Sequence, residues 1–387
     1  MMRLGKLAGA VIGCALTWAG PACAQESKGE PFELVRSLQS LQDQVARGNT
    51  RAHANQRVLL ARIAEQFDAV NPEVWKEPKN ARAAVLFVLS GGNARVLQKL
   101  IGSDAKIDID EKLLKGALAF GEGRLDEAAQ LLGGVEARAL DPSIAGHVAF
   151  VQGELVAQKE PAKALAHLDD ARLLSPGTII EEAALRRQIA LLAATGKADR
   201  YETLATQYLR RFPNSVYAGS FRQQFAAAIA VNTNAAEPGR LARLESMLGG
   251  VGPVDRRDVY LTIAKEALVK GNVEMARFAA ANAARLVGED GEGMERAQLY
   301  EGAVLIVSDD FEKGVELLSA VERGKLAEPD AVLLDAALAI AGQVRRLPEP
   351  PEPEDAAPPA ANEGAGQAVA RAQKTIAQVD EILSGAK

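Results

Sequence analysis

Residues 113–132 read LLKGALAFGEGRLDEAAQLL, and they predict two short helices joined by a turn. Apolar residues recur at helical spacing on both sides of Gly121-Glu122-Gly123-Arg124, a glycine-rich turn. Asp110 precedes the first helix, in the position of an N-cap. The stretch is therefore a helix–turn–helix unit.

Similar units recur along the chain at nearly constant spacing. Counted from Gly123, comparable turns fall at Lys159, Gly196, Gly271 and Asp309. The steps are 36, 37, 75 and 38 residues, and the step of 75 spans two units, with a degenerate one near residues 232–234. Five residues after each turn stands a mostly small residue, where the two helices would approach most closely: Ala128, Ala164, Tyr201, Ala276 and Gly314. Pro176 and Pro213 each follow their turn by 17 residues and would end a second helix. We therefore predict six units.

The repeat pattern predicts the fold class, because a single helix pair cannot bury its apolar face and consecutive pairs must stack. The body is rich in strong helix formers and has few β-branched runs. Over roughly residues 110–326 it resembles the tetratricopeptide and related helical-repeat families, although their aromatic positions are mostly absent. We expect an all-α, tetratricopeptide-like helical-repeat solenoid over residues 110–345. The curved surfaces of such solenoids generally hold peptides or other proteins.

Helical segments are also predicted on both sides of the repeats. Residues 25–109 would form an N-terminal capping region, with helices over Pro31–Arg47, Gln56–Val70 and Ala81–Leu89. The proline- and glutamate-rich residues 346–366 predict an extended acidic linker. Residues 367–387 predict a tethered amphipathic helix, with an apolar stripe at Val369, Ala372, Ile376, Val379 and Leu383. This helix could dock on its own body or in a partner's groove, and the sequence leaves both open.

Residues 1–24 predict a cleaved signal peptide. Two basic residues precede the apolar run Leu7–Trp18, and Ala22-Cys23-Ala24 fits the pattern of a signal peptidase site, with cleavage between Ala24 and Gln25. The run is shorter than the roughly 20 residues that a spanning helix needs, so we expect a mature chain that does not span the membrane. Lipid attachment at Cys14 is an alternative, but it would leave a very short apolar stretch.

Cleavage would change what the mature chain can do. It removes Cys14 and Cys23, the only two cysteines, which excludes disulfides and thiolate metal sites. It leaves 43 basic and 51 acidic residues, a formal charge of -8. No basic stripe alternates with aromatic residues, so the sequence argues against a nucleic-acid partner.

The motifs of catalysis and cofactor binding are missing. His53, His147 and His167 lie far apart without metal-ligand spacing, and there is no nucleophile elbow or phosphate-binding loop. Residues 288–293 miss the calcium-loop pattern and are interpreted as a turn. We therefore predict a non-enzymatic protein without metal, cofactor or small-molecule substrate. Three basic residues on the first helices of their units are candidates for contact with an acidic or peptide partner: Arg186, Lys265 and Arg296.

Four blocks of sequence resemble a known family. They read PFELVRSLQSLQD (31–43), AVLFVLSGGN (84–93), SPGTIIEEAALRR (175–187) and QYLRRFP (207–213), and they are similar to MotC, a family of periplasmic motility proteins of rhizobial-type bacteria. None of them is chemically diagnostic, and no binding residue can be carried over. The resemblance implies a periplasmic accessory of the flagellar motor that acts on the periplasmic part of the stator protein MotB in motility and chemotaxis.

Two other functions fit parts of this pattern. A periplasmic repeat adaptor for envelope assembly or cell division would have the same signal peptide and the same stacked helices. An exported hydrolase is disfavoured, because no activated nucleophile or metal constellation is present.

Overall fold

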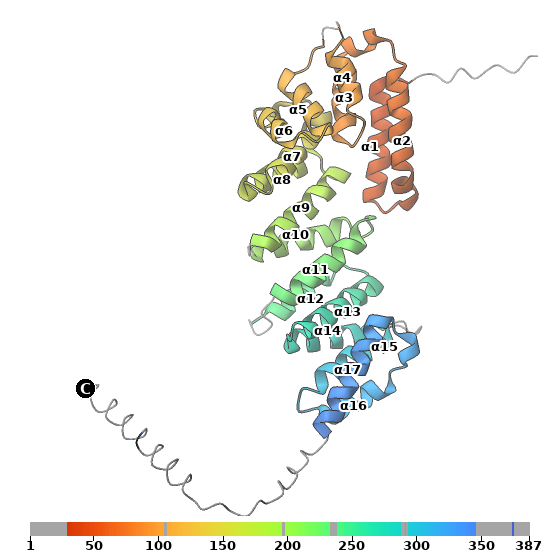
Figure 1. Cartoon of the computed structure of the whole chain (residues 1–387), viewed down its shortest axis with the longest axis vertical. Helices are drawn as coiled ribbons and strands as arrows, with labels where there is room; N and C mark the ends of the chain where they lie inside the picture. The colour runs from red at the N-terminus through yellow and green to blue at the C-terminus, as the bar shows by residue number, and fades with distance from the viewer. Residues whose placement is uncertain are drawn as a thin grey trace, which may run out of the picture. The chain divides into compact units, whose positions relative to one another are not determined.

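The computed structural model describes residues 29–103, 107–195, 198–232, 238–287, 291, 293–345 and 374, and all regular structure in these ranges is helical (Figure 1). The chain divides into two compact units, one up to Tyr300 and one from Glu301. Within the described ranges, no helix is both long enough and apolar enough to cross a membrane. The expected signal peptide with its Ala24–Gln25 cleavage site and the acidic linker lie outside these ranges, as does the tail helix except for the helical Lys374.

The first compact unit begins with a helical hairpin and a second, shorter pair. The elements are α1 (Pro31–Ala46), α2 (Thr50–Asp68), η1 (Pro72–Lys76), α3 (Pro78–Leu89) and α4 (Arg95–Ile101). Helix α1 buries Val35, Leu38 and Val45 of its predicted stripe. Helix α2 begins six residues earlier than predicted, because the Asn49 side chain caps it by accepting the N–H of Ala52 at 3.0 Å.

Helix pairs then follow one another in chain order. They are α5 (Glu111–Gly121) with α6 (Leu125–Leu132), α7 (Pro142–Val156) with α8 (Pro161–Leu174), α9 (Ile179–Thr195) with α10 (Ala198–Arg211), α11 (Ala218–Asn232) with α12 (Arg240–Leu248), α13 (Pro253–Val269) with α14 (Val273–Arg285), and α15 (Met294–Leu305) with α16 (Phe311–Ala320). The short η2 (Ala137–Ala139) follows α6, and η3 (Arg323–Lys325) and α17 (Glu328–Arg345) follow α16. In the first compact unit each pair packs on the next, as in a helical-repeat solenoid.

The predicted register of the repeats is confirmed. The turns at Gly123, Lys159, Gly271 and Asp309 each connect the two helices of a pair, and the degenerate unit is α11 with α12. Gly196 lies outside the described residues. Helices α8 and α10 end at Leu174 and Arg211, just before the two prolines that were expected to stop them.

The helices of a pair approach most closely at small residues, as predicted. Ala128, Ala164 and Ala276 are completely buried. A Cβ atom on Gly153 of α7 would lie 3.3 Å from the carbonyl oxygen of Ala164 in α8, and a Cβ on Gly302 would lie 3.0 Å from that of Gly314. Larger residues at these positions would force the helices of a pair apart.

The hairpin of α1 and α2 does more than the capping role expected for residues 25–109. Helix α1 packs against α3 and also against α9, far along the chain. The Asp43 carboxylate accepts the N–H of Ile179 at 3.0 Å, and the carbonyl of Val45 accepts the N–H of Val216 at 3.2 Å. The ring of Tyr217 meets His53 edge to face. The hairpin therefore lies along the repeats up to the connection before α11 (Figure 1). As domain boundaries, residues 109/110 and 345/346 stay predictions.

Candidate functional site

The three basic candidates lie on first helices, as the repeat register predicted. Arg186 is on α9, Lys265 on α13 and Arg296 on α15, and each side chain is partly exposed. Arg186 belongs to a cluster around the buried Glu182, whereas Arg296 lines a groove between α11 and α13. Their roles in binding stay predictions.

Arg186 compensates a buried charge. The Glu182 side chain is completely buried on α9, and its carboxylate accepts from Arg186 Nε at 2.9 Å, from Tyr208 Oη at 2.6 Å and from Ser215 Oγ at 3.3 Å. The guanidinium also stacks over the ring of Tyr217, 4.4 Å from its centroid. Burial, together with the nearby Glu182, raises the pKa of the Tyr208 hydroxyl well above its usual value, so the hydroxyl remains a donor. Arg186 therefore helps to hold α9 against α10 and the segment before α11.

Arg296 lines a groove of about 260 Å³ on the first helices α11, α13 and α15. Arg222 of α11 pairs with Asp255 of α13 at 2.7 Å in this groove. Asp258 and Thr262 continue the lining along α13, and Lys265 follows Thr262 by almost one helical turn. The groove thus presents carboxylates as well as cations, and it suits a polypeptide of mixed charge better than the purely acidic partner considered from the sequence.

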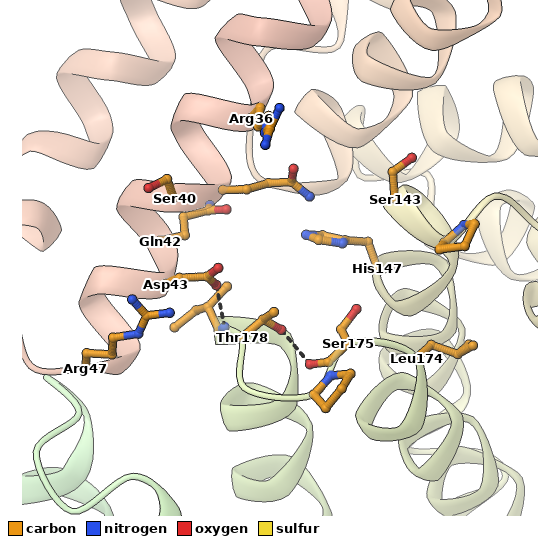
Figure 2. Close-up of a pocket in the computed structure, with 14 residues that line it drawn as sticks. Arg36, Ser40, Gln42, Asp43, Arg47, Ser143, His147, Leu174, Ser175 and Thr178 are labelled. Atoms are coloured by element: carbon orange, nitrogen blue, oxygen red, sulfur yellow. Dashed lines mark hydrogen bonds between the residues drawn. The ribbon is translucent and has the colours of Figure 1, made fainter.

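A second candidate site is a polar cavity of about 450 Å³ between α1, α7 and the connection from α8 to α9 (Figure 2). Helix α1 contributes one wall, because positions 36, 40, 43 and 47 fall on one helical face. Figure 2 shows His147 of α7 reaching toward that wall from the opposite side, with Ser175 and Thr178 below it. The Thr178 hydroxyl donates to the carbonyl oxygen of Ser175 at 2.7 Å, which fixes the connection.

Two buried side chains of this cavity have unmet hydrogen-bonding capacity. His147 is 7% exposed and Gln42 is 6% exposed, and neither His147 Nε2 nor Gln42 Oε1 has a hydrogen-bond partner. Burial lowers the pKa of His147 to about 4, so the imidazole is neutral at neutral pH. Burial also raises the pKa of Asp43, while the Ile179 N–H and the charge of Arg47 act in the opposite direction.

Sequence reasoning missed this cavity. It treated His147 as a solvated or core-edge histidine, and it assigned no role to Arg36, Gln42 or Asp43. The helices that meet here are distant in the chain, and neither helix carries a recognisable motif. A local signal did exist, since α1 carries charged residues at one-face spacing beside its apolar stripe. Among the described residues, no three His, Cys, Asp or Glu side chains are grouped so that they could hold a metal ion.

Comparison with known proteins places the chain in a family. The family model described as "Chemotaxis protein MotC" matches residues 2–387. The chemotaxis protein MotC of Rhizobium meliloti (strain 1021) is 32% identical over 338 residues, which cover 87% of this chain and 77% of that protein. No solved structure matches the chain significantly. The match extends far beyond the four blocks that suggested it, and the chain belongs to the MotC family of chemotaxis proteins.

Proposed function

We propose that this protein is a non-enzymatic periplasmic accessory of the flagellar motor, and that it binds the periplasmic part of the stator protein MotB. Membership of the MotC family of chemotaxis proteins is the observation that carries the proposal. The stacked helix pairs support it, because such repeats provide extended surfaces for other polypeptides. The signal sequence expected over residues 1–24 supports the periplasmic location.

The groove between α11, α13 and α15 is the contact surface that we propose for MotB. It is built on first helices, and its paired Arg222 and Asp255 offer both signs of charge to an approaching chain. The tail helix expected over residues 367–387 would act as a second contact, and the linker before it would raise its effective concentration near the first. A scaffold that binds one arrangement of the stator more tightly than another shifts the stator toward it without any chemistry.

Calorimetric titration of the mature protein with the periplasmic region of MotB tests the proposal. We expect saturable binding that is weakened at least about tenfold by Arg296→Glu, which reverses a charge in the groove. Arg57→Glu is the matched control, because Arg57 is an exposed residue of α2 that does not line the groove, and it should bind like the wild type. Absence of binding by the wild-type protein would contradict the proposal.

A deletion strain separates the motor role from the adaptor role. Loss of swimming in cells of normal shape is expected for a motor accessory. Chained cells or a leaking envelope with normal flagellar rotation would instead identify an adaptor for envelope assembly or cell division. N-terminal sequencing of the protein from a periplasmic extract should begin at Gln25.

A further inference from the structure

The cavity between α1, α7 and the α8–α9 connection is built for a polar occupant. His147 Nε2 and Gln42 Oε1 face it from opposite walls, on residues that are more than nine-tenths buried, and neither atom has a partner. A buried polar atom left unpaired costs about 1–3 kcal/mol, so an occupant that can hydrogen-bond to both is favoured. Figure 2 shows both side chains directed into the same space.

The charges around the cavity define what that occupant carries. Arg36 and Arg47 line it at the two ends of the α1 wall, with Asp43 between them, and the neutral His147 adds no charge. Within the described part of the chain, Arg36 forms no ion pair. The lining therefore has an excess of one positive charge, with two sites for carboxylates and one for a cation. Guanidinium groups favour carboxylates because they can donate two parallel hydrogen bonds.

We propose that this cavity binds a small acidic amino acid, a molecule with two carboxylates and one ammonium group. Its carboxylates contact Arg36 and Arg47, and its ammonium group donates to Asp43 and to Gln42 Oε1. A volume of about 450 Å³ suits a molecule of this size and excludes a folded partner. The occupant would touch α1 on one side and α7 with the α8–α9 connection on the other, so it would strengthen the attachment of the N-terminal hairpin to the repeats.

Calorimetry on the mature full-length protein tests this site with L-glutamate and L-aspartate as probes. We expect saturable binding of at least one of them and a rise in the melting temperature with its concentration. Glutarate and succinate, which lack the ammonium group, should bind at least about tenfold more weakly, and so should L-glutamine, which lacks the second carboxylate. Failure of both acidic amino acids to bind at millimolar concentration would overturn the proposal, as would equal binding of the comparators.

Two conservative variants locate the binding. Asp43→Asn keeps an oxygen that can accept the Ile179 N–H but removes the charge, so it should weaken L-glutamate without loosening α1. Arg36→Gln should weaken it at least about tenfold and leave the melting temperature of the free protein unchanged. Arg57→Gln on α2 is the matched control and should bind normally. Binding that none of the cavity variants alters would place the ligand elsewhere and overturn this assignment. Because the site does not involve the groove of α11, α13 and α15, these outcomes are independent of the titration with MotB.

Discussion

Buried polar side chains hold neighbouring elements of this chain together. Gln152 of α7 donates its amide hydrogens to the carbonyl oxygens of Leu132 and Val135, and Gln188 of α9 donates to the carbonyl oxygen of Leu165 and to Asp169. Each glutamine thus joins a first helix to the pair before it. Glu182 does the same with charge, since its three donors come from α9, α10 and the segment before α11. Fully paired groups of this kind fix one arrangement of the helices, whereas an unpaired member is costly.

Replacing Glu182 with alanine should destabilise the first compact unit by about 3 kcal/mol, because it leaves the Tyr208 hydroxyl buried and uncompensated and removes the partner of Arg186. Urea unfolding followed by circular dichroism measures the change. Glu65→Ala on the exposed face of α2 is the control and should stay within about 0.5 kcal/mol. Equal effects of the two substitutions would show that the cluster contributes no stability.

The buried His147 makes stability depend on pH. Its pKa is about 4 in the folded protein and 6.5 as the ordinary value, so the unfolded chain takes up a proton that the folded one does not. This contribution is complete above pH 6.5, and stability is lost as the pH falls toward 4, by up to about 3 kcal/mol. The advantage of the wild type over His147→Gln, measured by urea unfolding, should shrink between pH 7.5 and pH 4.5. A difference that is constant across this range would contradict the burial of a neutral imidazole.

At the scale of the helix, small residues determine how closely the two members of a pair pack. Gly116, Gly153 and Gly302 occupy equivalent places in their first helices, and a Cβ atom on any of them would come within 3 Å of a leucine side chain in the second helix. The second helices present alanine or glycine to the same interface in three of the pairs. Spacing is thus set by side-chain volume, and the same backbone can repeat with different sequences.

Gly153→Ala should destabilise the first compact unit by about 1–3 kcal/mol, because the added methyl group would collide with Leu168 and press on the Ala164 carbonyl. Gly219→Ala in α11 is the control, since a Cβ there meets nothing within 4 Å, and alanine should leave stability unchanged or raise it slightly. Thermal unfolding of both variants decides the matter. A stabilising Gly153→Ala would mean that α7 and α8 can separate without cost.

The elements that the sequence predicted well are those determined by near neighbours. Turns at Gly123 and Gly271, the stops before Pro176 and Pro213, and the N-cap at Asp110 each depend on residues within a few positions, and all are found. The early start of α2 was missed because the cap at Asn49 was overlooked. The cavity was out of reach for a different reason, since Arg36 and His147 meet only through tertiary packing of α1 on the repeats.

On the scale of the first compact unit, the N-terminal hairpin departs from simple repeat behaviour. In an ideal array each pair contacts only its neighbours, and stability is a sum over adjacent terms. Here α1 contacts α9, and the turn after it meets residues 214–217 before α11. Gly48 makes this approach possible: it has a φ of +99°, and a Cβ on it would lie 2.3 Å from the Asn214 carbonyl oxygen. The hairpin and the repeats should therefore unfold together.

Gly48→Ala should release the hairpin, because alanine would both strain the left-handed backbone and clash with Asn214. We expect a loss of at least about 2 kcal/mol and faster hydrogen exchange in α1 and α2 than in α13 and α14. Gly91→Ala is a matched control with a φ of +93° and nothing within 4 Å, so it carries only the backbone cost of about 1 kcal/mol. Similar exchange in the two variants would show that the Asn214 contact does not hold the hairpin.

The bonds from Asp43 to Ile179 and from Val45 to Val216 also bear on the order in which the polypeptide matures. Synthesis delivers the first helix long before the residues that complete its surroundings, so this helix must wait, partly uncovered, until about half of the protein has followed. Shortening the gene from its 3′ end would for the same reason not act as a graded removal of modules. Any fragment that stops before residue 216 would lose order at its opposite end as well as at the cut.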